Sequence, residues 1–125
     1  VTTPQDIALT DVRRGISMFN RVNVEILGVV ENMSYYVCPS CGHREDVFSH
    51  GGGSNIAKEL DAPFLGELPL NMKVREGGDE GMPVVLNREA PHQSEAVMQL
   101  ARNMVAEIRR KNFRDTLTPT VQISL

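Results

Sequence analysis

The residues with the clearest chemical potential lie in one short loop, Cys38-Pro39-Ser40-Cys41-Gly42, which holds both cysteines of the chain. A C-x-x-C spacing followed by glycine lets the backbone curl, so that two thiolates can point at one soft metal ion. Structural zinc sites and iron–sulfur clusters both use about four ligands. The loop therefore supplies part of a metal site and needs further ligands from elsewhere.

Interpretations of this dithiol differ in where the missing ligands come from. His43 and His50 could complete an intrachain zinc site, although Cys41 and His43 are too close in sequence to be comfortable partners. A redox dithiol would need its first cysteine at a helix N-terminus, whereas the proline and glycine of the loop indicate a turn. The pair could also be two reduced thiols without a role. We favour a site shared between two copies of the chain, holding zinc or an iron–sulfur cluster; the spacing does not choose the metal.

Length, charge and composition bound the class of protein. The chain has 125 residues, of which 41% are hydrophobic, and this is enough for one domain with a core. A net charge of -3 gives no global attraction to nucleic acid or an anionic membrane, and no apolar run approaches the roughly 20 residues of a membrane span. Two cysteines are too few for a disulfide scaffold, so a reducing compartment such as the cytoplasm is expected. Because the chain opens on Val1, we expect it to be a piece of a longer protein.

The predicted elements alternate in the way typical of α/β proteins. Thr3 is predicted to cap a helix that begins at Pro4 and runs to Asn20. The apolar run over residues 24–30 is predicted to be a parallel strand buried on both faces, and residues 64–68 are a further strand candidate. The fold class is therefore α/β, with a mostly parallel sheet and flanking helices.

The C-terminal part is predicted to form a long helix from Pro91 to about Arg110, with its methionines packed in the core. One domain over residues 1–111 is expected, followed by a disordered tail over 112–125. The remaining expectations are a ribbon pairing Val47-Phe48 with residues 35–37, a flexible glycine run at 51–53 before a helix over 56–60, a short helix over 71–76, a loop over 77–83, an extended segment over 84–86 and an edge strand at 121–123.

The end of the strand over 24–30 offers a position for binding a nucleotide. Ligands of open α/β sheets bind beyond the carboxyl ends of strands, where Asn32 lies. Its amide both donates and accepts, so it could read a base or could satisfy the turn that follows. A phosphate loop needs a lysine followed by serine or threonine, whereas Lys58, Lys73 and Lys111 are followed by Glu, Val and Asn. This chain therefore contains no Walker A element.

Several motifs occur in an informative order. They are Val1-Thr2-Thr3-Pro4-Gln5, Gly28-Val29-Val30-Glu31-Asn32-Met33-Ser34, Cys38-Pro39-Ser40-Cys41-Gly42, Leu65-Gly66-Glu67-Leu68-Pro69-Leu70 and Asp79-x-Gly81-x-Pro83-x-Val85. In this order they resemble the Mrp family of iron–sulfur cluster carrier proteins. These proteins are P-loop ATPases related to MinD and to the nitrogenase iron protein, and they include the mitochondrial complex I assembly factor. The resemblance covers about residues 1–108, and the chain looks like the C-terminal half of such a protein.

The resemblance implies a homodimer in which Cys38 and Cys41 of each subunit hold one bridging four-iron–four-sulfur (4Fe-4S) cluster, delivered to apo iron–sulfur proteins. It also implies that the complete protein binds ATP with magnesium, with Asn32 recognising adenine and Pro69 lying against the base. The implied fold is an incomplete, MinD-like P-loop NTPase lacking the Walker A half, so hydrolysis is not expected of this chain alone. The implied location is the cytoplasm or the mitochondrial matrix. A zinc-stabilised interaction domain with a structural C-x-x-C loop is the alternative.

Overall fold

The computed structural model describes residues 1–117, and the side chains of residues 1–114. Its elements in chain order are α1 (Asp6–Arg21), β1 (Val29–Glu31), β2 (Tyr36–Val37), β3 (Arg44–Glu45), α2 (Gly52–Glu59), β4 (Phe64–Glu67), α3 (Met72–Glu80), the 3-10 helix η1 (Val84–Leu86) and α4 (Pro91–Leu117). This order confirms the α/β class. No helix among the described residues is both long and apolar enough to cross a membrane.

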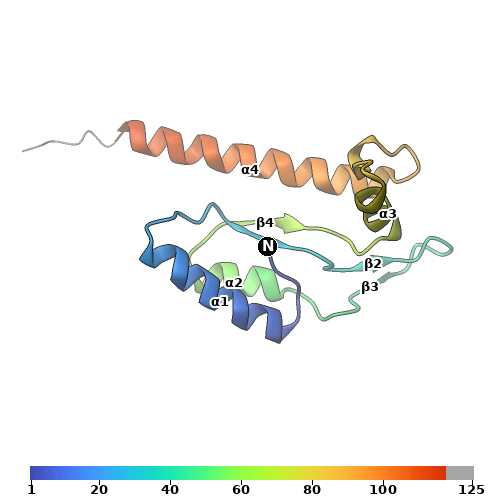
Figure 1. Cartoon of the computed structure of the whole chain (residues 1–125), viewed down its shortest axis with the longest axis horizontal. Coiled ribbons are helices and arrows are strands. Elements are labelled where there is room, and N and C mark those ends of the chain that lie inside the picture. Colours follow the sequence, from blue (N-terminus) through green and yellow to red (C-terminus); the bar gives the residue numbers. More distant parts are fainter. Residues whose placement is uncertain (118–125) are drawn as a thin grey trace, which may run out of the picture.

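A small parallel sheet joins the N-terminal segment, β1 and β4. β1 and β4 run parallel, with Val29 opposite Phe64. On the other edge of β1, Thr2 forms a parallel bridge to Glu31, so the segment before α1 lies beside β1. Figure 1 shows α1 and α2 on one side of these strands and α4 on the other. The layers are those of an α/β protein whose sheet is covered on both faces.

The core lies between the first two helices and β1. Leu9 of α1, Val29 of β1 and the pair Ile56 and Ala57 of α2 form its buried cluster. Ile56 is only 1% exposed, so its side chain is surrounded by protein on every side. Apolar positions from separate elements thus converge on one cluster, as burial of apolar surface requires.

The first sheet strand is shorter than predicted. The sequence predicts a strand over 24–30, but only Val29–Glu31 belongs to the sheet, and residues 24–28 pair with no strand in the described part of the chain. The Val29 N–H donates to the Pro63 carbonyl at 2.8 Å. Proline has no N–H to continue the ladder, so the pairing with β4 stops there. Val24 is consequently 48% exposed.

Helix ends also differ from the predictions, because the residues that cap the helices are not the expected ones. Gln5, and not Thr3, is the N-cap of α1, and the Thr3 hydroxyl donates to the Gln5 side chain. Asn71 caps α3 by accepting from the Lys73 N–H at 2.8 Å, and Gly81 ends that helix with a positive φ that suits glycine. The predicted loop after residue 76 therefore begins as helix, and the segment predicted as extended is η1.

The last helix is confirmed and is longer than predicted. α4 continues to Leu117, beyond the predicted end near Arg110, so the first residues of the expected tail are helical. The rest of that tail, including the edge strand expected at 121–123, lies outside the described residues. The Asn103 amide donates to the Leu65 carbonyl at 2.7 Å and fixes the helix on β4.

The apolar stripe of α4 is only partly covered. Val97 and Leu100 are half-buried, whereas Met104 and Ile108 are 38% and 43% exposed. The prediction that the methionines of this helix pack in the core is therefore wrong for this chain. Periodicity identifies the apolar face of a helix, but a neighbouring element must be present to bury it.

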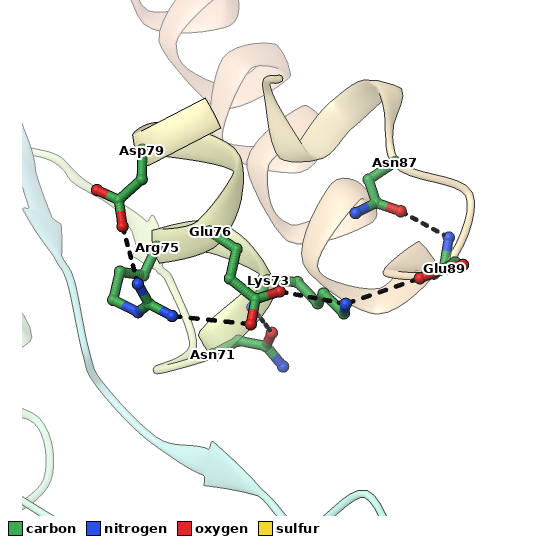
Figure 2. A network of polar contacts seen from close by, with 7 residues as sticks. All are labelled: Asn71, Lys73, Arg75, Glu76, Asp79, Asn87 and Glu89. Atoms are coloured by element: carbon green, nitrogen blue, oxygen red, sulfur yellow. Dashed lines mark hydrogen bonds and ion pairs between the residues drawn. The ribbon is translucent and has the colours of Figure 1, made fainter. Parts of the chain in front are cut away.

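A group of exposed ion pairs joins α3 to the segment before α4 (Figure 2). The Lys73 ammonium lies 3.2 Å from a Glu76 carboxylate oxygen and 3.7 Å from one of Glu89. The hydrogen bond and charge of Glu76, together with the charge of Glu89, raise the pKa of Lys73. Such solvent-exposed pairs orient neighbouring elements but stabilise a fold only slightly.

Candidate functional site

The two cysteines lie at the tip of a short ribbon. β2 and β3 pair antiparallel, with Val37 opposite Arg44. Between them the Cys38 N–H donates to the His43 carbonyl at 2.9 Å, and the Gly42 N–H donates to the Cys38 carbonyl at 2.8 Å. Gly42 has φ +72, a conformation that favours glycine. The ribbon agrees with the prediction, but its second strand begins three residues before the predicted Val47-Phe48, because the sequence does not show where so tight a loop closes.

The loop favours a thiolate at its first cysteine. Cys38 is half-buried and Cys41 is exposed, and both are free thiols. The backbone N–H groups of Cys41 and Ser40, followed by the Cys41 side chain, lower the pKa of Cys38. Hydrogen bonds to the charged form stabilise it, and the thiolate is the form that binds metals. The redox interpretation fails on geometry, because Cys38 follows a strand and not the start of a helix.

This pKa shift gives a direct prediction. Cys41→Ser leaves Cys38 as the chain's only thiol. Its rate of alkylation by iodoacetamide, followed by mass spectrometry as pH is varied, is expected to rise with a midpoint below the value of about 8.5 of an ordinary thiol. The same variant in urea, where the loop is unfolded, should return to the ordinary midpoint. Equal midpoints in the two conditions would show that the loop does not stabilise the thiolate.

The histidines do not complete an intrachain zinc site. Nδ1 of His50 lies 3.4 Å from a carboxylate oxygen of Asp46. Among the described residues, no group of three or more His, Cys, Asp or Glu side chains is placed to hold a metal ion. The set Cys38, Cys41, His43 and His50 is therefore not assembled, and this interpretation of the loop is wrong for the single chain.

The ribbon is attached to the end of the sheet at one side. The Arg44 guanidinium stacks 3.8 Å from the centroid of the Tyr35 ring and lies 3.3 Å from the Glu67 carboxylate at the end of β4. The Leu70 N–H donates to the Tyr35 carbonyl at 2.7 Å. Figure 1 shows the ribbon extending past the strands. The dithiol loop thus lies beyond the carboxyl ends of the parallel strands.

The structure brings Asn32 and Pro69 to this same end. The Ser34 N–H donates to the Leu68 carbonyl at 3.0 Å, which holds the segments after β1 and β4 side by side. The Asn32 side-chain oxygen accepts from the Met33 N–H at 2.9 Å, so in this chain the asparagine satisfies its turn. Pro69 is buried. Asn32 and Pro69 therefore lie close enough to contribute to one binding site. Recognition of a base by either residue stays a prediction.

The sequence does not predict the buried position of Glu31 in this region. Glu31 ends β1 and is 0% exposed, and its carboxylate accepts from Ser34 and from the N–H of Gly53. The glycines at 51–53, predicted as a flexible exit, instead start α2, with Gly51 as its N-cap. An acidic residue closing an apolar strand is the only signal that the sequence offers, and it does not reveal that the side chain is buried.

The fold and this end of the sheet define a class. A parallel α/β sheet carries, beyond the carboxyl ends of its strands, a dithiol loop that favours thiolate and, among the described residues, has too few ligands for a metal site. The chain belongs to the ParA family of NUBPL-type iron-transfer P-loop NTPases, whose family model matches residues 1–105. The expected resemblance is confirmed.

Relatives in several organisms agree with this assignment. The chain is 44% identical, over its full length, to the "Iron-sulfur protein required for NADH dehydrogenase, mitochondrial" of Arabidopsis thaliana. It is also 44% identical over 108 residues, or 86% of the chain, to the "Iron-sulfur cluster carrier protein" of Escherichia coli K12. It spans 39% of the first relative and 29% of the second, so it corresponds to a minor part of each.

A solved structure supports the fold. A nucleotide-binding protein from Archaeoglobus fulgidus, determined in complex with ADP, superposes with a TM-score of 0.57 at 34% sequence identity. The match covers 66% of this chain and 34% of that one. The expected P-loop NTPase type of α/β fold is confirmed, in a chain whose own sequence has no Walker A element.

Proposed function

We propose that the chain supplies Cys38 and Cys41 to a 4Fe-4S cluster that bridges two copies of the protein and is passed to apo iron–sulfur proteins. The observation that carries the proposal is a loop with two thiols whose backbone N–H groups favour thiolate, but with no third metal ligand among the described residues. Two such loops related by a two-fold axis provide the four thiolates that a cluster requires. Relatives named as iron–sulfur cluster carriers support the same role.

The residues of the loop suit temporary holding of a cargo. Cys41 is exposed at the ribbon tip, and Cys38 is half-buried behind it. A cluster held there lies at the surface, where a second copy and a recipient protein can both approach. Reduced cysteines fit the cytoplasm or the mitochondrial matrix, which are the compartments that we propose.

We propose ATP binding only for the complete protein and not for this chain alone. Asn32 and Pro69 would contribute the part of the site that faces the base. Phosphates and magnesium would be bound by a P-loop and its lysine, and this chain has neither. The proposed ATP dependence of cluster transfer therefore belongs to a protein with the length of the relatives.

Anaerobic reconstitution with iron and sulfide tests the cluster proposal. We expect about four irons per dimer and a broad absorption near about 400 nm, typical of cysteine-ligated clusters. Cys38→Ser or Cys41→Ser should abolish most of the absorption and leave a monomer in size-exclusion chromatography. His43→Ala, a change in the same loop, should retain both the iron and the dimer.

The possible outcomes separate the metals. A full cluster on a monomer, or a dimer indifferent to both cysteine substitutions, would contradict the bridging arrangement. Stoichiometric zinc without visible absorption would support the alternative of a zinc-stabilised interaction domain, because zinc has no d-electron transitions.

A further inference from the structure

Glu31 is a buried carboxylate with an unusual set of partners. It is 0% exposed, and one oxygen accepts from the Ser34 hydroxyl at 2.5 Å. The other oxygen accepts from the backbone N–H of Gly53. A carboxylate removed from water is tolerated only when its oxygens are hydrogen-bonded. An apolar residue at this buried position would need no hydrogen-bond donors, whereas Glu31 needs both Ser34 and Gly53.

The two donors flank the cysteine loop. Ser34 lies two residues before the ribbon, and Gly53 lies in the first turn of α2, the next element after the ribbon. The segment that contains the ribbon and both cysteines therefore begins at Ser34 and ends at Gly53, and both of these residues donate to the Glu31 carboxylate. Since Ser34 is itself 0% exposed, both ends of the excursion are fixed inside the protein.

The start of α2 is shaped around this carboxylate. A Cβ atom on Gly53 would lie 2.8 Å from the Glu31 Cβ and 3.1 Å from its Oε2, so only glycine leaves room. Gly51, the N-cap, offers no side chain to the first N–H groups of the helix. The Glu31 side chain instead accepts from the Gly53 N–H and so satisfies one of these groups.

We propose that Glu31 is a positioning residue that closes the base of the cysteine loop and thereby sets how firmly Cys38 and Cys41 hold their metal. It acts through Ser34 and Gly53. The proposal rests on the proposed function, because a loop without cargo needs no such precision. Outer partners that orient metal ligands commonly change metal retention by about 10–100-fold when removed.

The main variant is Glu31→Leu, which keeps an apolar side chain of similar size but removes both acceptors. We expect the reconstituted cluster to be lost to an iron chelator at least about tenfold faster than in the wild type. In the metal-free chain, amide exchange of β2 and β3 should accelerate at least about tenfold relative to amides of β1 and β4. Glu31→Gln should restore near wild-type behaviour, because its oxygen can accept from Gly53 while its NH2 donates to Ser34.

Three further variants keep the test decisive. Ile56→Ala weakens the core without touching the loop and should leave the ratio of ribbon to sheet exchange unchanged. Ser34→Ala removes one anchor and should act in the same direction as Glu31→Leu, which keeps the proposal testable if the latter does not fold. Glu45→Gln, an exposed carboxylate on β3, serves as the charge control.

The results decide the two proposals separately. Wild-type ribbon exchange in Glu31→Leu, or equal acceleration in Ile56→Ala, would overturn the positioning role. A wild-type chain that takes up no cluster would overturn the proposed function, and the exchange measurements on the metal-free chain would still decide whether Glu31 closes the loop.

Discussion

Gly28→Ala is expected to lower the free energy of unfolding by about 3 kcal/mol, at the upper end for an overpacked core. A Cβ atom at this position would lie 2.6 Å from the Leu65 Cγ and 2.7 Å from the Pro63 carbonyl oxygen. Leu65 is 4% exposed and cannot swing into solvent. The segments leading into β1 and β4 would therefore separate, which strains the hydrogen bond from Val29 to Pro63.

Gly15→Ala is the matched control for this substitution. Gly15 lies within α1, and a Cβ atom added there would meet nothing within 4 Å outside its own helical backbone. Alanine is a better helix former than glycine, so this variant should be more stable by about 0.5–1 kcal/mol. Urea denaturation followed by circular dichroism measures both changes. A loss of stability of the same size in the two variants would show that the close approach at Gly28 is not the cause.

The chain of 125 residues is expected to show no ATP turnover above the background of the assay. The lysine and the Gly-rich loop that hold phosphates in this class are missing from its sequence. The helix start that most resembles an anion site, that of α2, is already filled by the Glu31 carboxylate. The two residues proposed to face the base offer no group that holds phosphates, because Asn32 accepts from the Met33 N–H and Pro69 is buried.

Phosphate release and isothermal titration calorimetry test this expectation, with a working P-loop ATPase assayed in parallel. Weak binding, in the millimolar range or above, corresponds to about 4 kcal/mol or less, which a base contact alone can supply. Micromolar affinity for ATP would contradict the prediction, because it would require a phosphate site that the sequence does not contain.

Local patterns in the sequence predict the elements better than their limits. The long apolar stripe identifies α4, and the run ending at Val30 identifies a strand. The extent of that strand depends on Pro63, far along the chain, where the ladder of hydrogen bonds stops. Met104 is likewise exposed because the elements packed against α4 cover only part of the helix. Periodicity describes one element, whereas burial belongs to pairs of elements.

The residues of the candidate site also differ in whether a local sequence pattern can identify them. Cys38 and Cys41 can be found because a C-x-x-C loop is a local arrangement. The role of Glu31 cannot be found in this way, because its partner Gly53 is 22 residues away in the sequence. Their contact exists only after α2 has packed against β1. The proximity of Asn32 and Pro69 follows from a topological rule, that the carboxyl ends of neighbouring parallel strands meet at one edge.

The unequal exposure of the two cysteines predicts an order of ligand exchange for the proposed cargo. A thiol of a recipient protein would reach the exposed Cys41 before the half-buried Cys38. Cys41 would then be the first ligand exchanged and Cys38 the last. A cargo still held by Cys38 while Cys41 is exchanged would not need to diffuse free between donor and acceptor.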